Sequence, residues 1–228
     1  MTTATVTRWW LIRHAPVTTH GGRIYGNDDY PADCSDALTM AGLAALLPPE
    51  PVWVTTQLQR TAQTAAAIAA ARGAPPPMAG IEADLAEQHF GDWQGLTHEQ
   101  LASRRDGAWH RFWLAPAHEV PPGGESFEQV VERVGRAMAR LTTAWPGRDI
   151  VAVAHGGSIR AALAVALEIE PERALAFAVD NCSLTRIDHI DGAGFSGGVA
   201  PKGSWRVGAV NLHPRGLTSP PRAPAADR

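Results

Sequence analysis

Two histidines in this chain follow short apolar runs, and each has an arginine nearby in the sequence. Residues 9–12 lead into Arg13 and His14, and residues 150–154 lead into His155. Apolar runs followed by helical patterns indicate parallel strands, and open α/β sheets bind ligands at the carboxyl ends of such strands. We therefore expect the two imidazoles to meet at one site. Because a guanidinium grips phosphate or carboxylate with two hydrogen bonds, arginine is a residue type suited to binding an anion.

A sheet must bring these histidines together, and the rest of the chain alternates strand-like and helical patterns. Ser35 or Asp36 can cap a helix that Pro48 and Pro49 end. The patterns predict strands at residues 9–12, 52–55 and 150–154, β-like runs at 175–179, 184–190 and 204–210, and helices at 37–47, 57–71, 97–101, 108–114, 125–145 and 158–167. The patterns between the strands at 52–55 and 150–154 therefore predict a helical insertion or lid in an α/β fold.

Length and composition favour one domain over residues 1–213, followed by a flexible proline-rich tail at 214–228. Hydrophobic residues make up 45% of the 228 residues, which is enough for a packed core. A net charge of −3 and a pI near 6.3 do not indicate binding to nucleic acid or to an anionic membrane, because both favour a basic protein surface. No feature of the sequence indicates an oligomeric state.

The cysteines and the N-terminus favour a reduced, cytoplasmic location. Cys34 and Cys182 are too few for a disulfide framework, so we expect two free thiols. Residues 1–8 lack the basic region and apolar core of a signal peptide. No apolar stretch approaches the length that spans a membrane.

Five motifs occur in order along the chain, and together they carry a family resemblance. They are Leu11-Ile12-Arg13-His14, residues 55–65, residues 87–95, Pro122-Gly123-Gly124-Glu125-Ser126 and residues 153–157. In this order and spacing they resemble the histidine phosphatase, or phosphoglycerate mutase-like, superfamily over about residues 8–210. The resemblance implies a three-layer α/β/α sandwich around a mainly parallel sheet, a phosphohistidine intermediate and no obligatory metal or other cofactor.

His14 is the candidate nucleophile. Phosphoryl transfer needs a nucleophile in line with the leaving oxygen, and a neutral imidazole attacks phosphorus without first losing a proton. We expect the other ring nitrogen to bond a backbone carbonyl, which would fix the tautomer. For an isolated histidine, a strand-end core residue is the simpler interpretation, but the surrounding motif favours catalysis.

Positive groups must surround the phosphoryl oxygens during transfer. Arg13 and Arg60 are candidate clamps, although an arginine in the first turn of a helix is more often an ordinary solvated residue. We expect His155 to donate a hydrogen bond to a phosphoryl oxygen. The alternative, as for His14, is that it is a buried histidine of the core with no role in catalysis. Gly156 and Gly157 leave room for the ligand beside the backbone.

Glu87 is the candidate general acid. The leaving alkoxide needs a proton, and neighbouring phosphate charge favours the protonated form of a nearby glutamate. Its motif position carries this assignment by resemblance. The simpler alternative is a solvated loop carboxylate, and Glu82, Asp84 and Asp92 are rivals for the role.

The first loop departs from the family's commonest form, because His20 stands where many members have asparagine. Residues 21–31 are instead similar to the loop of α-ribazole phosphatase-like members. Asn27 or Arg23 is a candidate replacement for the missing substrate contacts, the alternative being a purely structural loop residue. Ser126 precedes a long helix, where it can act as an N-cap, contact substrate phosphate or do both.

These observations predict a phosphomonoesterase of the histidine acid phosphatase type that acts on a small phosphorylated metabolite, with α-ribazole phosphate as a named candidate. A phosphoglycerate mutase-type transferase is the alternative enzyme, and a non-catalytic phospho-ligand-binding protein is the alternative from another class. The nine histidines show no metal-ligand spacing, and cations flank the two at the predicted site, so we expect no metal ion.

Overall fold

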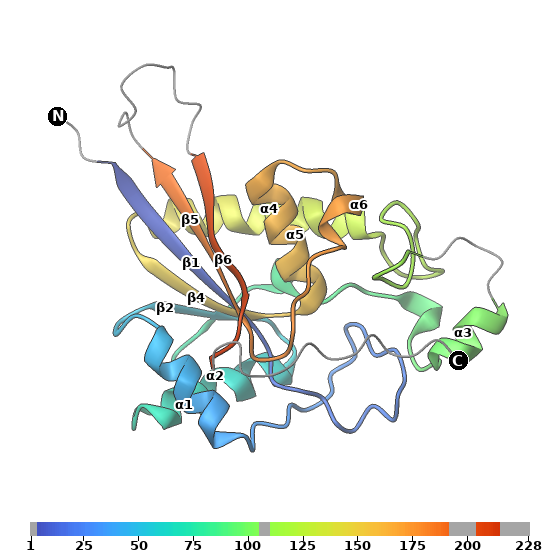
Figure 1. Ribbon diagram of the computed structural model, residues 1–228, viewed down its shortest axis with the longest axis horizontal. Coiled ribbons are helices and arrows are strands. Elements are labelled where there is room, and N and C mark those ends of the chain that lie inside the picture. Colours follow the sequence, from blue (N-terminus) through green and yellow to red (C-terminus); the bar gives the residue numbers. More distant parts are fainter. Residues whose placement is uncertain (1–3, 105–109, 192–203, 215–228) are drawn as a thin grey trace.

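A six-stranded sheet forms the centre of the protein in the computed structural model, which describes residues 4–104, 110–191 and 204–214 (Figure 1). The strands are β1 (Thr5–Arg13), β2 (Val52–Thr55), β3 (Gly80–Ile81), β4 (Asp149–Ala154), β5 (Leu184–Asp191) and β6 (Ser204–Leu212). Their order is β3-β2-β4-β1-β5-β6. The first four are mutually parallel, whereas β5 runs antiparallel to β1 and to β6. The predicted, mainly parallel sheet is confirmed.

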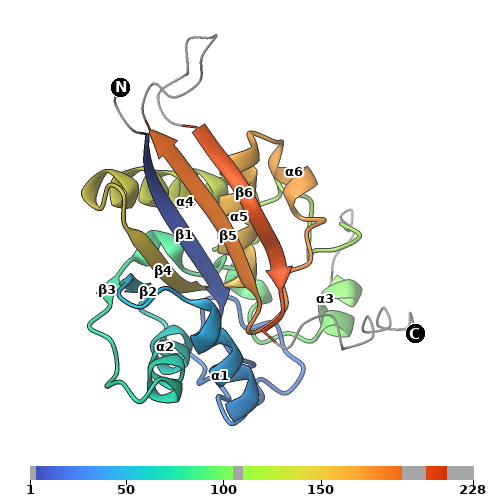
Figure 2. The same ribbon diagram turned by 60° about the vertical axis from the view of Figure 1, so that its left-hand side comes forward.

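Helices cover both faces of this sheet. Along the chain they are α1 (Ala37–Leu46), α2 (Gln59–Ala71), α3 (His98–Arg104), α4 (Phe127–Ala144), α5 (Gly156–Leu167) and α6 (Pro171–Ala174), with short 3-10 turns η1 (Ala83–Leu85) and η2 (Gly91–Trp93). Figures 1 and 2 show α1 and α2 on one face and α4 and α5 on the other. This arrangement is the predicted α/β/α sandwich.

The alternation of side chains along the strands explains the two layers. Trp9 and Leu11 belong to the core cluster under α4 and α5, whereas Ile12 belongs to the cluster under α1 and α2. Successive strand residues point to opposite faces, so a central strand needs apolar residues at nearly every position. β4 meets this need, because all residues from Ile150 to Ala154 are at most 1% exposed.

Part of the region between β3 and α4 forms a packing cluster of its own beside the sandwich, where both views place α3, whereas Leu85 and Ala117 of this region belong to the main core. The cluster combines residues of the insertion with one residue of the first loop, and its buried members are Ile24, Phe90, Trp93, Leu101 and Ala115. A β-bridge between Arg23 and Thr97 joins the same two segments. The predicted insertion is therefore present, and it is fused to the loop that follows His14.

The prediction of a β-run at residues 175–179 is wrong, because this segment forms turns after α6. Leu175 and Val179 are buried by packing in the helix-covered core, which produced the apolar pattern without a sheet. The carbonyls of Phe177 and Val179 accept hydrogen bonds from arginine side chains instead of a neighbouring strand.

The predicted helix at residues 108–114 is also wrong where it can be compared, because 110–114 have no helical structure and form a turn from which Trp113 and Leu114 pack against the core of the insertion. Residues 108 and 109 lie outside the described residues. So does the predicted tail, except for Pro214, which lies against Gly42 of α1. No helix of the described ranges is long and apolar enough to cross a membrane.

Candidate active site

The pairing of β1 with β4 brings the two histidines together. Arg13 is in register with Ala154, so the next residue on each strand is a histidine, and His14 N donates to Ala154 O at 3.0 Å. The ring centroids of His14 and His155 are 5.1 Å apart, with 59° between the ring planes. Both side chains are almost fully buried. The carboxyl ends of two adjacent parallel strands therefore form the centre of the site.

The surroundings of His14 leave one ring nitrogen available for attack. Its Nδ1 lies 2.7 Å from the carbonyl oxygen of Ala15, which can only accept, so Nδ1 carries the proton. Burial, with the charges of Arg13 and Arg60, lowers the pKa of His14 to about 3. The ring is therefore neutral, and its lone pair is on Nε2. This is the backbone hydrogen bond predicted from the sequence.

His155 has the opposite tautomer. Arg60 Nε, which can only donate, lies 3.3 Å from His155 Nδ1, and Thr56 Oγ1 lies 3.0 Å from Nε2. Burial, with the positive charges of the nearby arginines, holds the pKa of His155 well below its ordinary value, so the ring is neutral with its proton on Nε2. Thr56 was not predicted, although it lies within a motif at the end of β2.

Arg60 lies in the first turn of α2, yet it is fully buried. Its terminal nitrogens donate to the carbonyls of Asp28 and Gly26, and its guanidinium lies 5.3 Å from the centroid of the Tyr25 ring. Burial lowers its pKa, and the neighbouring acidic groups oppose that shift. The alternative of a solvated helix-face arginine is thereby excluded.

Arg13 and Arg160 approach each other where α5 begins. Arg13 Nη1 donates to Val179 O at 2.6 Å, but its buried Nε has no partner among the described residues. A Cβ on Gly156 would lie 3.5 Å from that Nε and 3.2 Å from Arg160 Nη1. A buried guanidinium N–H without a partner is costly unless an anion binds it, so this corner fits a phosphate or carboxylate.

Arg160 is a further residue of the site that was not assigned from the sequence. It donates to Phe177 O at 2.8 Å and to Gly156 O at 3.1 Å, and it lies 4.7 Å from the centroid of the Trp113 ring. Burial and the nearby Arg13 lower its pKa to about 10. The sequence signal was its position four residues after Gly156, which puts both on one side of α5.

Glu87 meets the start of α5 from the insertion. Its Oε1 and Oε2 accept from Gly157 N at 3.0 and 3.2 Å, and Oε1 also accepts from Gln88 N. A Cβ on Gly157 would lie only 2.2 Å from Oε1, so this close contact requires glycine.

The three rival carboxylates have other surroundings. Arg140 pairs with Glu82 at 2.7 Å and with Asp84 at 3.5 Å, and Asp92 lies near Gly123. Among the contacts of the described chain, Glu87 is the one of these four carboxylates that touches the segment after His155. The structure thus brings the predicted acid, rather than its rivals, to the start of the helix that follows His155.

The remaining predicted residues hold loops in place. Arg23 donates to Gly95 O at 2.7 Å, and the backbone N of Asn27 lies 3.3 Å from Gln94 Oε1. Ser126 caps α4, since its hydroxyl accepts from Gln129 N while its own N donates to the Gln129 side chain. Substrate contacts of these three residues stay predictions.

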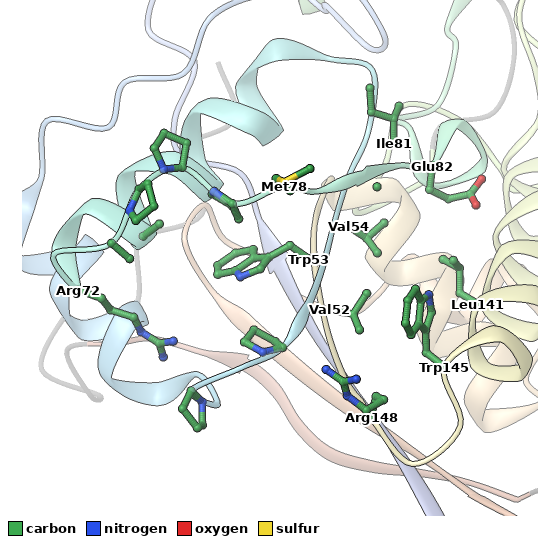
Figure 3. Close-up of a pocket in the computed structure, with 18 residues that line it drawn as sticks. Val52, Trp53, Val54, Arg72, Met78, Ile81, Glu82, Leu141, Trp145 and Arg148 are labelled. Carbon is green, nitrogen blue, oxygen red and sulfur yellow. The ribbon is translucent and has the colours of Figure 1, made fainter.

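A second concave region lies apart from the histidines, at the sheet edge formed by β2 and β3. This cavity of about 700 Å³ is lined mainly by apolar side chains and prolines, among them Trp53 and Trp145, together with the charged residues Arg72, Glu82 and Arg148, as Figure 3 shows. None of the predicted site residues lines it. Within the described ranges, no group of three or more His, Cys, Asp or Glu side chains is arranged to hold a metal ion. Metal independence therefore stays a prediction.

Comparisons with known proteins agree with this geometry. Residues 9–196 match the family described as "Histidine phosphatase superfamily (branch 1)". The chain is 35% identical over 174 residues to glucosyl-3-phosphoglycerate phosphatase of Mycolicibacterium vanbaalenii, covering 71% of this chain and 74% of the relative. It is 33% identical over 162 residues to the metal-independent phosphoserine phosphatase of Arabidopsis thaliana, covering 68% and 67%.

Some curated relatives are much longer than the matched region. The chain is 38% identical over 115 residues to a bifunctional protein of Mycobacterium tuberculosis, which is half of this chain and only 30% of that relative.

Two solved structures extend the likeness to the fold. A mycobacterial glucosyl-3-phosphoglycerate phosphatase gives a TM-score of 0.74 at 28% identity, covering 92% of this chain and 99% of the other. The α-ribazole phosphatase of Shigella flexneri gives 0.68 at 25% identity, covering 90% and 96%. With the matched family spanning most of its length, this chain belongs to branch 1 of the histidine phosphatase superfamily.

Proposed function

We propose that this chain is a metal-independent phosphomonoesterase that works through a phosphohistidine on His14. The observation that carries the proposal is the tautomer of His14, whose proton is bonded to Ala15 while its Nε2 lone pair is free to attack. In the first step, Nε2 attacks phosphorus, the bond from phosphorus to the ester oxygen breaks, and Glu87 protonates the leaving oxygen.

The second step returns the enzyme to its starting state. Water attacks the phosphorus, the bond from phosphorus to Nε2 breaks, and the proton of the water passes to the Glu87 carboxylate. Inorganic phosphate leaves, and His14 is again neutral. The contact of Glu87 with Gly157, at the start of the helix that follows His155, supports both proton transfers from one position.

Fixed positive groups stabilise the charge on the transferring phosphoryl group. Arg13 presents an Nε that has no partner among the described residues, and Arg60 is buried beside His155. Because these groups are held before substrate binds, they need no reorganisation in the transition state. His155 supplies a further donor once its Nε2 proton turns from Thr56 to a phosphoryl oxygen.

We propose a small phosphorylated metabolite as the substrate and the cytoplasm as the location. Relatives named for glucosyl-3-phosphoglycerate, phosphoserine and α-ribazole phosphate support the substrate class without selecting one member, and α-ribazole phosphate remains a candidate. The low net charge supports a partner other than nucleic acid.

Trapping the intermediate tests the proposed function. Acid-labile phosphate should map to His14 by mass spectrometry after rapid quenching during turnover of p-nitrophenyl phosphate, and His14→Ala should abolish both label and turnover. Binding of phosphate without turnover would favour the non-catalytic alternative. Label on another residue would refute His14 as the nucleophile.

A further inference from the structure

We propose that Arg133 of α4 is a positioning residue that fixes the carboxylate of Glu87 beside Gly157. The inference rests on the proposed function, because it assigns a support to the proposed acid. Arg133 Nη1 donates to Asp84 O at 2.7 Å and to Ala86 O at 2.9 Å, and Nη2 donates to Glu87 O at 3.2 Å. One guanidinium therefore holds three carbonyls of the segment that carries the acid.

Glu125 fixes this guanidinium from the other side. Arg133 Nε lies 3.0 Å from Glu125 Oε2, and Nη2 lies 2.8 Å from Oε1. The same Oε1 accepts from His89 N at 3.0 Å, and the Glu125 carbonyl accepts from the Gln88 side chain at 2.8 Å. The ion pair thus grips the chain both before and after Glu87.

These contacts occupy every donor of the arginine. A guanidinium has five N–H groups, and Arg133 uses one from Nε, two from Nη1 and two from Nη2. Lysine provides a point charge with three donors and cannot reproduce this planar set. Because Arg133 contacts the backbone of Glu87 rather than its carboxylate, it acts through the acid and is not itself catalytic.

The segment needs such a support because it has little regular structure. Just the two-residue strand β3 and the 3-10 turn η1 precede Glu87 in this segment, whereas α4 is a long helix with a capping box at Ser126 and a buried face. The contacts of Arg133 therefore hold the loop at a fixed position relative to α4. A displacement of about 1 Å at a catalytic group can cost about 10²-fold in rate.

Arg140 offers a matched control on the same helix. It pairs with the carboxylates of Glu82 and Asp84, just before the acid, but its side chain is 53% exposed. Because solvent reaches the arginine, the pair contributes less to stability than a fully buried one, even though the Glu82 side chain is only 13% exposed. Arg140→Met therefore removes an arginine from the same helix and the same loop without touching the carbonyls beside Glu87.

The experiment measures phosphoenzyme formation in single turnovers with O-phosphoserine and with p-nitrophenyl phosphate. The alkyl ester needs the acid, whereas the aryl ester leaves with little help. We expect Arg133→Met to slow the reaction with O-phosphoserine by about 10- to 10²-fold, with a much smaller effect on the aryl ester. Arg133→Lys should recover part of the lost rate with O-phosphoserine. Arg140→Met should keep the wild-type ratio of the rates with the two esters.

A double variant separates positioning from general damage. If Arg133 acts only through Glu87, Glu87→Gln with Arg133→Met should be no slower than Glu87→Gln alone. Equal losses for both esters, or losses that multiply in the double variant, would overturn the inference.

Two further outcomes are also decisive. If Arg133→Met does not fold, because Glu125 is left as an unpaired charge, the Arg133→Lys variant and the double Arg133→Met, Glu125→Gln variant give the same selectivity test. If the wild type forms no phosphoenzyme, the proposed function fails and this inference fails with it. A wild type that forms one, with unchanged selectivity in the Arg133 variants, overturns the inference alone.

Discussion

At the scale of single residues, two buried histidines acquire different roles from their first neighbours. The carbonyl of Ala15 forces the His14 proton onto Nδ1, and the Nε–H of Arg60 forces the His155 proton onto Nε2. Burial keeps both rings neutral. One ring therefore has a lone pair suited to attack, while the other has a proton suited to donation.

The depressed pKa of His14 predicts how stability depends on pH. The unfolded chain gains a proton on this residue below pH 6.5, whereas the folded chain does so only near pH 3. The unfolded state binds more protons in this window, so the free energy of unfolding falls as pH falls. When the pH falls from 7 to 5, the free energy of unfolding of the wild type should decrease by about 2 kcal/mol more than that of His14→Asn. Urea unfolding at both pH values measures this difference, and parallel losses would contradict the assigned neutrality.

Glu87→Gln should slow phosphoenzyme formation according to the leaving group. General acid catalysis contributes about 10²- to 10⁴-fold, so an alkyl phosphate should lose a factor in this range. p-Nitrophenyl phosphate should lose far less, because its phenolate is a good leaving group. Single-turnover rates are required, since steady-state rates can report water attack instead. Equal losses for the two esters would mean that Glu87 only shapes the site.

The residues predicted from the sequence were those with strong local signals. His14, Arg13 and His155 lie at strand ends, and Arg60 and Glu87 lie in recognisable motifs. Thr56 and Arg133 escaped prediction because His155 and Glu87, the residues they contact at the site, are distant from them in sequence, whereas Arg160 was missed despite its local spacing from Gly156. Arg133, for example, holds Glu87 from 46 residues away, and no local spacing reveals that contact.

At the scale of elements, the start of α5 is the point on which the site converges. The register of β1 and β4 sets where this helix begins, and its glycines admit Arg13, Arg160 and Glu87 to within contact distance of the backbone. Any larger residue there would meet a functional side chain. The close contact with Glu87 requires glycine at position 157, whereas a Cβ at position 156 would crowd the ends of Arg13 and Arg160 only slightly.

Gly157→Ala should damage catalysis without unfolding the protein. The new methyl group would lie 2.2 Å from Glu87 Oε1, and this flexible side chain would have to move away from the Gly157 amide. We expect a loss of about 10²-fold in the rate with an alkyl phosphate. Gly135→Ala in α4 is the control, because its Cβ would meet only Val165 at 3.4 Å. A Gly157→Ala enzyme as active as this control would argue against the close contact.

The elements that sequence patterns predicted are those whose burial follows a regular period. β2, β4 and the long helix α4 were found within a few residues. The β3 strand was missed, since two exposed residues carry no period. The apolar pattern at 175–179 resembled that of a strand because helices bury this segment. An apolar pattern indicates that residues are buried, but it does not show that they pair with a strand.

At the scale of the whole molecule, the first loop and the insertion form one wall beside the catalytic residues. Gln94 Nε2 donates to Asp28 Oδ1 at 2.6 Å, and the Asp28 carbonyl in turn accepts from Arg60. The wall is therefore connected to the phosphate clamp by a continuous chain of hydrogen bonds.

The distribution of charge over the molecule also predicts that EDTA leaves activity unchanged. Arg13, Arg60 and Arg160 converge from three separate elements and supply the positive charge that a metal ion would otherwise provide.

The histidines are also poorly suited to a metal. A structural or catalytic zinc site needs at least three protein ligands, but the His155 Nδ1 lone pair already accepts from Arg60 and only His14 Nε2 offers a free one. Turnover of p-nitrophenyl phosphate before and after dialysis against EDTA, with metal content measured by mass spectrometry, checks the prediction. Activity that disappears with the metal and returns only when a divalent ion is added would mean that the arginines do not suffice, and the proposed mechanism would need a metal to stabilise the phosphoryl charge.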